Sequence, residues 1–392
     1  MPLNNSDFHN WLISIHRDFH RHPELSLQET RTTARIVAIL EELGIDTRRF
    51  DDMTGAVGLI TGAEQGKTIA LRADIDALPV TELNKTDYRS ENDGVMHACG
   101  HDVHATIMLG VARKIVDSEI MEKLSGNVKF LFQPAEERVA GAGAMIELGV
   151  LENPRVDRII AAHVTPQLEV GEIGVFKHLG FASADRFVLT ITGKGGHGAR
   201  PEECIDPIVA GAHFITQVQS IISRNIKAQD AAVITVGKFT AGVASNVIPE
   251  TAVLEGTLRA LEKNVRICLI ERLKSLSEGL EKPFGVKTNF ILHEGVPPGL
   301  NDKTVSADLF KAAAKIVGKN NVAYIPPVMG AEDFAYFTQA RPGAMIRLGC
   351  ANKAEGIVFP LHSPRFDIDE KVLDIGVTIF YEAIKQYLSQ IG

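Results

Sequence analysis

The chain has 392 residues, of which 45% are hydrophobic and 23% charged, a globular composition at a length that usually forms two domains. The formal net charge of −8 offers no basic surface to nucleic acid or to an anionic membrane, so neither is expected as a partner. The sequence contains no run of 18 apolar residues, which excludes a typical transmembrane helix.

The N-terminus and the cysteines indicate the compartment. Residues 1–6 are polar and lack the apolar core of a secretory signal. The cysteines have no paired spacing, which is typical of a reducing compartment rather than of a disulfide framework: they are Cys99, Cys204, Cys268 and Cys350. We therefore expect a cytoplasmic protein.

Helices and strands alternate over the first part of the chain. A helix is expected from Ser6 to about Arg21, and a second one, introduced by a capping box of Ser26 and Glu29, ends at Gly44. The remaining elements are strands near 56–59, 68–72, 128–132 and 158–162, with helices near 104–116 and 142–148. This alternation predicts an α/β sheet with helices on its faces.

From about residue 184 the order of elements changes. Strands are expected at 186–192, 231–236, 251–258 and 286–292, with helices at 206–222 and 265–280. This is the βαββαβ order of a ferredoxin-like unit. Helix and strand patterns resume from about 304 to 387. We therefore expect a first domain of residues 1–183 and 296–392, into which residues 184–295 are inserted.

Polar side chains follow three of the expected strands. They are Asp74 and Asp76, then Glu136 and Glu137, then His163. In open α/β sheets, ligands bind outside the carboxyl ends of the strands. The segment 97–104, which contains Cys99 and His101, lies between the first two strand ends in the sequence. These groups are therefore expected to form a metal site at one edge of one sheet.

Cys99 and His101 flank Gly100, whose conformational freedom allows both side chains to converge on one point. Thiolate and imidazole are ligands that suit a borderline-soft ion such as zinc. Taken alone, the tripeptide is equally compatible with a buried cysteine beside a hydrogen-bonded histidine. The crowding of further histidines and Asp102 within the same segment favours a metal site.

The two pairs of acidic residues suggest different tasks. Adjacent side chains at a strand end point apart, so Glu137 and Glu136 could divide metal binding and proton removal from a bound water between them. Asp74 and Asp76 share a face if their strand continues, and one of them is expected to orient a histidine ligand. The alternatives are an exposed loop pair and ordinary strand-end capping.

The segment 193–198 matches G-x-G-x-x-G but fails as a dinucleotide motif, because Pro201 precedes the next helix and no acidic residue lies near position 215. We interpret His197, which glycines surround, as an exposed donor for a developing oxyanion. A cysteine-protease interpretation of Cys99 with His101 would leave Glu136, Glu137 and His163 unexplained.

Motifs at seven places carry a family resemblance: RADIDALP at 72–79, MHACGHD at 96–102, FQPAEE at 132–137, GGHG at 195–198, NVIP at 246–249, GAEDF at 330–334 and LH at 361–362. In this order they closely resemble the M20 metallopeptidase superfamily, in its aminoacylase-like amidohydrolase branch. That branch includes hippurate hydrolases, N-acetyl-diaminopimelate deacetylases and auxin-conjugate hydrolases. The resemblance covers nearly the whole chain.

The resemblance implies an α/β metal-dependent exopeptidase-like catalytic domain with a mixed sheet and helices on both of its faces. One or two divalent metals per subunit would be bound by Cys99, His101, Glu137, His163 and His362. Manganese or zinc is expected, and cobalt or nickel also suits this donor set. Glu136 would be the general base and acid, and Asp76, or else Asp74, would orient a ligand.

The resemblance also implies roles for the inserted domain. Residues 184–295 would form a lid that mediates dimerisation, and His197 would stabilise the tetrahedral intermediate. Asn246 and Arg259 would hold the substrate carboxylate, since an arginine binds a carboxylate bidentately.

The implied activity is hydrolysis of the amide bond of a small-molecule N-acyl amino acid by a homodimer or a higher homo-oligomer. One alternative is a metallo-exopeptidase that uses the same groups on small peptides. Another is a binding or scaffold protein that has kept the fold, against which the presence of Glu136 and of every expected ligand argues.

Overall fold

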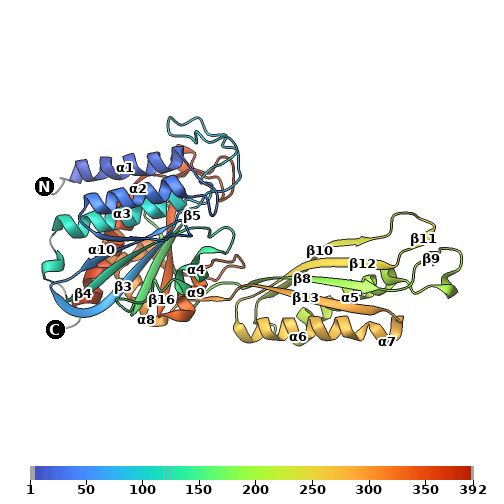
Figure 1. The fold of residues 1–392 in the computed structure, drawn as a ribbon. Coiled ribbons are helices and arrows are strands. Elements are labelled where there is room, and N and C mark those ends of the chain that lie inside the picture. The colour runs from blue at the N-terminus through green and yellow to red at the C-terminus, as the bar shows by residue number, and fades with distance from the viewer. Residues whose placement is uncertain (1–4, 119, 124, 390–392) are drawn as a thin grey trace. The chain divides into compact units, whose positions relative to one another are not determined.

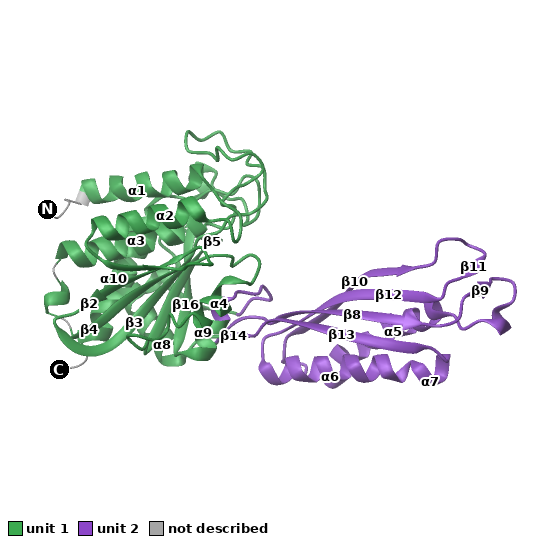
Figure 2. Cartoon of the chain, in the orientation of Figure 1, with its two compact units in different colours: residues 1–178, 300–326, 336–392 green, residues 179–299, 327–335 purple. Residues whose placement is uncertain are grey.

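The computed structural model describes residues 5–118, 120–123 and 125–389 (Figure 1). Residues 1–4, which carry most of the expectation about a secretory signal, lie outside these ranges. The chain divides into two compact units (Figure 2): unit 1 comprises residues 1–178, 300–326 and 336–392, and unit 2 comprises residues 179–299 and 327–335. Unit 2 thus extends past the expected 184–295 at both ends and includes the segment 327–335.

Unit 1 contains one eight-stranded sheet in the order β1-β2-β4-β3-β5-β16-β6-β15. The strands β4, β3, β5 and β16 run parallel, whereas β1 with β2, β2 with β4, and β16 with β6 pair antiparallel. Their bounds are β1 Asp46–Arg49, β2 Ala56–Thr61, β3 Glu64–Asp74, β4 Ser125–Gln133, β5 Arg158–Glu169, β6 Ile173–Phe176, β15 Val322–Ile325 and β16 Gly343–Ala351. The prediction of a mixed α/β sheet is confirmed.

Helices cover both faces of this sheet. On one face, α3, α8 and α10 pack against a core that includes Leu71, Phe130 and Ile346. Side chains on a strand alternate between the two faces of the sheet. Leu131, the buried neighbour of Phe130 on β4, therefore points to the other face, where α4 contacts β4. The helices are α1 Asn5–Arg21, α2 Thr30–Glu42, α3 His101–Ser118, α4 Gly141–Glu147, α8 Lys303–Val317, α9 Phe334–Ala340 and α10 Lys371–Ser389. Within the described ranges, no helix is long and apolar enough to cross a membrane.

The expected capping box does not form. Helix α2 begins at Thr30, and its N-cap residue Glu29 makes no side-chain cap bond. The carboxylate of Glu24 accepts instead from the backbone N–H groups of Arg31 and Thr32, at 3.0 and 2.7 Å. The hydroxyl of Ser26 donates instead to Oδ2 of Asp76 at 2.7 Å, and Oε1 of Glu29 accepts from the backbone N–H of Ala135 at 2.9 Å. The capping prediction was wrong because both side chains are used in tertiary contacts at the carboxyl ends of the strands.

Unit 2 has the predicted βαββαβ order. Its antiparallel sheet runs β10-β12-β8-β13, and the core between sheet and helices includes Phe187, Leu254, Phe214 and Leu269. Its elements are β8 Ala184–Thr192, α5 Pro207–Asn225, β10 Ala232–Ala241, β12 Thr251–Ala260, α6 Lys263–Gly279, α7 Glu281–Phe284 and β13 Lys287–Val296. Two small sheets complete it, β9 Gly196–His197 with β11 Val247–Ile248, and β7 Leu179–Phe181 with β14 Gly299–Leu300.

Candidate metal centre

The parallel strands of unit 1 bring three of the expected site segments to one level. Asp74 at the end of β3 pairs with Gln133 at the end of β4, so Glu136 and Glu137 follow directly beyond this edge. Arg72 pairs with Ala161 on β5, which places His163 level with Asp74. The parallel register of β3, β4 and β5 is therefore the physical reason why these residues, far apart in the sequence, meet. The expectation that the third strand ends at His163 was wrong, because β5 continues to Glu169.

The expected metal-binding atoms are close together. Sγ of Cys99 lies 3.4 Å from Nε2 of His163. Ligand atoms of Cys99, His101 and His163 all lie within 4.8 Å of one another, and the same holds for Cys99, Glu137 and His362. All five expected ligands therefore belong to overlapping groups that share Cys99 and that could hold a metal ion.

In two of the histidines Nδ1 has an oxygen partner, which leaves Nε2 as the nitrogen that could bind a metal. Nδ1 of His163 donates to the carbonyl of Val164 at 2.7 Å, which leaves Nε2 as the ligand atom facing Cys99. Burial, together with the cation of Arg347, holds the pKa of His163 well below its usual range, so the ring is neutral. Nδ1 of His101 contacts the carbonyl oxygen of Asp76 at 2.9 Å, and Nε2 of His101 is buried without a hydrogen-bond partner among the described residues.

These observations fit a divalent metal. A buried imidazole nitrogen without a partner costs free energy unless something binds it. Thiolate, neutral imidazole and carboxylate together form a donor set for zinc or another divalent first-row transition metal. Burial raises the pKa of the Cys99 thiol, so a bound cation is the natural means of stabilising its thiolate.

Asp76 connects the expected ligand His101 to both glutamates. Its Oδ1 lies 3.1 Å from Nδ1 of His101 and accepts from the backbone N–H of Glu136 at 3.1 Å. Its Oδ2 accepts from the N–H of Glu137 at 3.1 Å and from Ser26. Burial on its own raises the pKa of Asp76, but the hydrogen bonds from His101 and Ser26 outweigh it and lower the pKa below the usual value.

Asp74 makes different contacts. Its Oδ1 pairs with Nδ1 of His104 at 2.5 Å, and its Oδ2 accepts from Arg72 at 2.5 Å. Nε2 of His104 in turn accepts from the backbone N–H of Val164 at 2.9 Å. Asp74 thus fixes the peptide that follows His163, while Asp76 contacts Nδ1 of His101.

The loop that carries the two glutamates is held in an unusual conformation. Ala135 and Val139 have φ of 53° and 55°, a region that residues with a side chain rarely adopt. Glu29, fully buried, accepts from Ala135 with one oxygen and from the hydroxyl of Thr54 with the other. Burial raises the pKa of Glu29. The tertiary contact of Glu29 therefore stabilises a loop that local preferences would not select.

His362 reaches the site from a distant segment of unit 1. Its φ is 65°, its N–H donates to the carbonyl of Ala98 at 2.7 Å, and its Nε2 lies 3.5 Å from Oε1 of Glu137. The Glu137 carboxylate raises the pKa of His362. The backbone bond to Ala98 ties this histidine to the segment of Cys99.

The remaining expected residues lie in unit 2. His197 on β9 is exposed and pairs with Val247 on β11, and the N–H of Gly198 donates to the carbonyl of Asn246 at 2.9 Å. Arg259 lies near the end of β12 and donates to the carbonyl of Met329 at 3.0 Å. Thr251 and Arg259 are about 26 Å apart along β12, at about 3.3 Å per residue. Within unit 2, β9 and β11 lie at the end where β12 begins (Figure 1), so unit 2 brings His197 and Asn246 together but separates both from Arg259.

Sequence reasoning missed the functional placement of Glu29 and His104. Glu29 was interpreted as a helix cap, and His104 was counted only as part of a histidine-rich segment. The usable signal for His104 was its spacing of three residues from His101 at the start of a helix, which puts both on one face.

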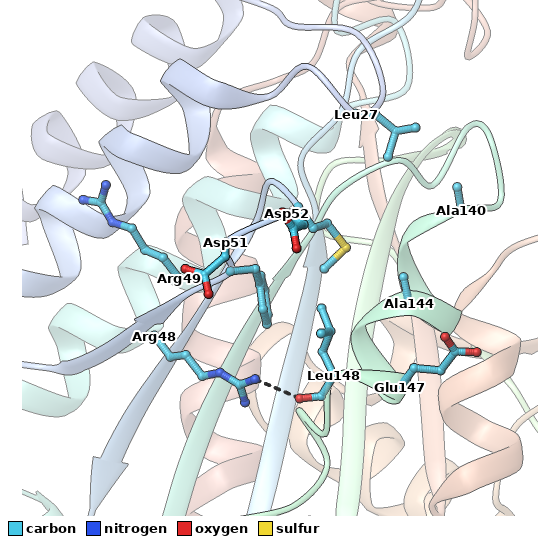
Figure 3. Close-up of a pocket in the computed structure, with 11 residues that line it drawn as sticks. Leu27, Arg48, Arg49, Asp51, Asp52, Ala140, Ala144, Glu147 and Leu148 are labelled. Atoms are coloured by element: carbon cyan, nitrogen blue, oxygen red, sulfur yellow. Dashed lines mark hydrogen bonds between the residues drawn. The ribbon is translucent and has the colours of Figure 1, made fainter.

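A cavity of about 570 Å³ lies elsewhere in unit 1 (Figure 3). Its lining includes Leu27, Ala140 and Ala144, and Arg48 donates to the carbonyl of Leu148 at 2.8 Å on one wall. None of the expected metal ligands lines this cavity, so the metal centre is separate from it.

Comparisons with known proteins give a consistent result. A model of peptidase family M20/M25/M40 matches residues 70–386. The chain is 38% identical to an N-acetyl-L-cysteine deacetylase of Bacillus subtilis (strain 168), over 99% of this chain and 90% of the relative. It is 39% identical to an N-acetyldiaminopimelate deacetylase of Lactococcus lactis subsp. cremoris (strain SK11), over 96% of this chain and 97% of the relative.

A solved structure agrees over the whole length. The YXEP protein of Bacillus subtilis, described as a dinuclear metal binding peptidase of the M20 family, superposes with a TM-score of 0.87 and 36% identity. The match covers 99% of this chain and 100% of the other.

Proposed function

The chain belongs to peptidase family M20/M25/M40, and from this premise we propose that it hydrolyses the amide bond of N-acyl amino acids, releasing a carboxylic acid and a free amino acid. The observation that carries the proposal is the connection through Asp76 of a buried histidine ligand with two adjacent glutamates. The deacetylase names of the relatives support the N-acyl class of substrate.

The metal would be bound by Cys99, His101, Glu137, His163 and His362, as one or two ions, with manganese or zinc as the first choice and cobalt or nickel as others that suit these donors. A divalent metal supplies Lewis-acid activation of water and of the amide carbonyl. Because both Nδ1 atoms of His101 and His163 contact backbone carbonyls, the ligand nitrogens are fixed before anything binds.

Glu136 would be the general base and acid. One of its carboxylate oxygens lies within 4.8 Å of the ligand atoms of His101 and Glu137. From this position it would take the proton of the attacking water and deliver it to the leaving amine nitrogen. An amine leaves poorly unless its nitrogen is protonated, so this second transfer is needed to break the amide bond. The backbone bond of Glu136 to Asp76 keeps its Cα at a fixed position relative to His101.

Unit 2 would contribute to substrate binding. His197 would donate to the oxyanion of the tetrahedral intermediate, and Asn246 and Arg259 would hold the substrate carboxylate. Thr251, five residues after Asn246, and Arg259 lie about 26 Å apart along β12, at about 3.3 Å per residue, so we do not expect one carboxylate to contact both Asn246 and Arg259 of one chain. We therefore propose a homodimer in which two copies supply these residues to one site.

The cysteines support a cytoplasmic location. Cys99, Cys204, Cys268 and Cys350 all carry free thiols. A thiol ligand in the metal site is compatible with a reducing compartment.

The proposal is tested by comparing substrates on the metal-loaded protein. N-acetyl and N-benzoyl amino acids should be hydrolysed with a higher kcat/KM than Xaa-Gly dipeptides, measured by release of free amino acid. A preference for the dipeptides would instead identify a metallo-exopeptidase that uses the same groups.

A further inference from the structure

A second cluster of buried charged side chains lies behind the metal centre, at the start of α3. It combines His16 and His20 of α1 with Asp102 of α3, Glu82 of the loop after β3, and Glu370 just before α10. His16 and Asp102 are 1% exposed, His20 4% and Glu82 7%. None of these side chains has a role in the proposed hydrolysis.

Each histidine lies between two carboxylates. Nδ1 of His20 is 2.7 Å from Oδ2 of Asp102, and its Nε2 is 3.3 Å from Oε1 of Glu82. Nε2 of His16 is 3.4 Å from Oδ2 of Asp102, and its Nδ1 is 3.3 Å from Oε1 of Glu370. Burial alone lowers the pKa of His20, but Asp102 and Glu82 raise it to about 10, so the ring is cationic.

Every carboxylate of the cluster has a partner without an added ion. Arg17 donates to both oxygens of Glu370, at 2.9 and 2.8 Å. The three carboxylates therefore face the rings of His16 and His20 and one guanidinium group. Two histidines and an aspartate also resemble a metal-binding set. However, every ring nitrogen already faces a carboxylate, so we interpret the cluster as an ion-pair network and not as a second metal site.

The network connects the two segments that carry ligands far apart in the sequence. Asp102 directly follows His101. Glu370 ends the segment that begins at His362, and within that segment the ring of Phe366 packs against Gly100. The loop of Glu82 contacts the same segment, because Asn84 donates to the carbonyl of Phe366 at 2.8 Å.

We propose that His20 and, through the shared Asp102 oxygen, His16 are positioning residues of the metal centre, which hold the segments 97–102 and 362–370 at the spacing that metal binding requires. The proposal rests on the proposed function in taking His101 and His362 as ligands. The spacing of four residues places both histidines on one face of α1, so one helix can hold both segments.

Two substitutions separate the contact of His20 with Asp102 from its contact with Glu82. The amide nitrogen of Asn takes the place of Nδ1, so His20→Asn keeps the donor to Asp102 and loses the one to Glu82. The amide nitrogen of Gln takes the place of Nε2, so His20→Gln keeps the donor to Glu82 and loses the one to Asp102. The two variants form a matched pair, because each keeps one hydrogen bond and neither keeps a cation.

The test measures metal affinity of the full chain by chelator competition with zinc, and the visible absorption of the cobalt-loaded protein. His20→Gln should bind zinc about ten-fold more weakly than the unsubstituted protein and show an altered cobalt spectrum. His20→Asn, which keeps the contact with Asp102 beside the proposed ligand His101, should lose less affinity than His20→Gln and change the cobalt spectrum less. Thermal unfolding of the metal-free variants serves as the control for a merely structural role.

Equal zinc affinities and equal cobalt spectra of the two variants would overturn the proposal. Losses of affinity that simply follow the unfolding temperatures of the metal-free variants would also overturn it. Neither readout depends on turnover, so a failure of the proposed hydrolysis on every substrate would leave this result independently interpretable.

Discussion

The carboxylate of Asp76 contacts Nδ1 of His101 at 3.1 Å and also accepts hydrogen bonds from the backbone N–H groups of Glu136 and Glu137. The proposed ligand and the proposed base are thus positioned by the same two oxygen atoms. Removing the charge of Asp76 should therefore affect both metal binding and turnover.

Asp76→Asn is expected to weaken metal affinity by about 10–100-fold. The amide nitrogen of Asn is itself a donor, so at least one of the N–H groups that Asp76 accepts from would lose its acceptor and the position of His101 would be less well fixed. Isothermal titration with zinc measures this change. Asp93→Asn, at an exposed position, is the control and should bind metal normally. An unchanged affinity in Asp76→Asn would contradict the positioning role.

Glu136→Gln should lower kcat by about 10²–10⁴-fold, because the amide cannot accept the proton of the attacking water. Its metal content, measured by elemental analysis after gel filtration, should equal that of the unsubstituted protein. Near-normal kcat in this variant would show that another group is the base.

Glu29→Leu should lower kcat because the N–H of Ala135 loses its buried acceptor, which costs about 1–3 kcal/mol and releases a loop with two residues at positive φ. Thr54→Val removes the other partner of Glu29 and leaves the contact with Ala135 in place, so it should retain most of the activity. Steady-state kinetics of both variants, with Glu29→Gln as the conservative substitution, measures the difference. Equal losses in Glu29→Leu and Thr54→Val would argue against a specific role for the Ala135 contact.

Metal binding should release at least one proton at neutral pH. Burial, with the negative charge of Glu137 and Glu136, raises the pKa of Cys99, so the metal-free protein holds the thiol and the bound state needs the thiolate. Below that pKa the affinity should fall by about ten-fold for each unit of lower pH. Titration calorimetry in buffers of different ionisation enthalpy counts the protons, and Cys99→Ser is the control that removes this contribution. A metal affinity that does not change between neutral and mildly acidic pH would contradict the release of a proton from Cys99.

The sequence predicted those features that depend on local patterns and on sheet geometry. Apolar strands that run into Asp74, Gln133 and His163 predicted that these residues lie level with one another, and the register of β3 with β4 and β5 confirms it, although β5 continues past His163 to Glu169. The βαββαβ order of unit 2 followed from the same kind of pattern.

Tertiary contacts explain what the sequence did not predict. Ser26 and Glu29 have the spacing of a capping box, but buried partners at the strand ends compete successfully for both side chains. The positive φ of Ala135 and Val139 follows from no local preference of these residues. The separation of Asn246 from Arg259 became apparent only once β12, which begins after Asn246 and contains Arg259, was seen to be one continuous strand.

The most direct measurement is release of free amino acid from N-acetyl amino acids by protein that has been stripped with a chelator and then reloaded. Our account predicts no release from the stripped protein and recovery of release with manganese or zinc. Release that persists fully after stripping would contradict a metal-dependent mechanism. Absence of release with every metal, while dipeptides are cleaved, would contradict the N-acyl amino acid as substrate.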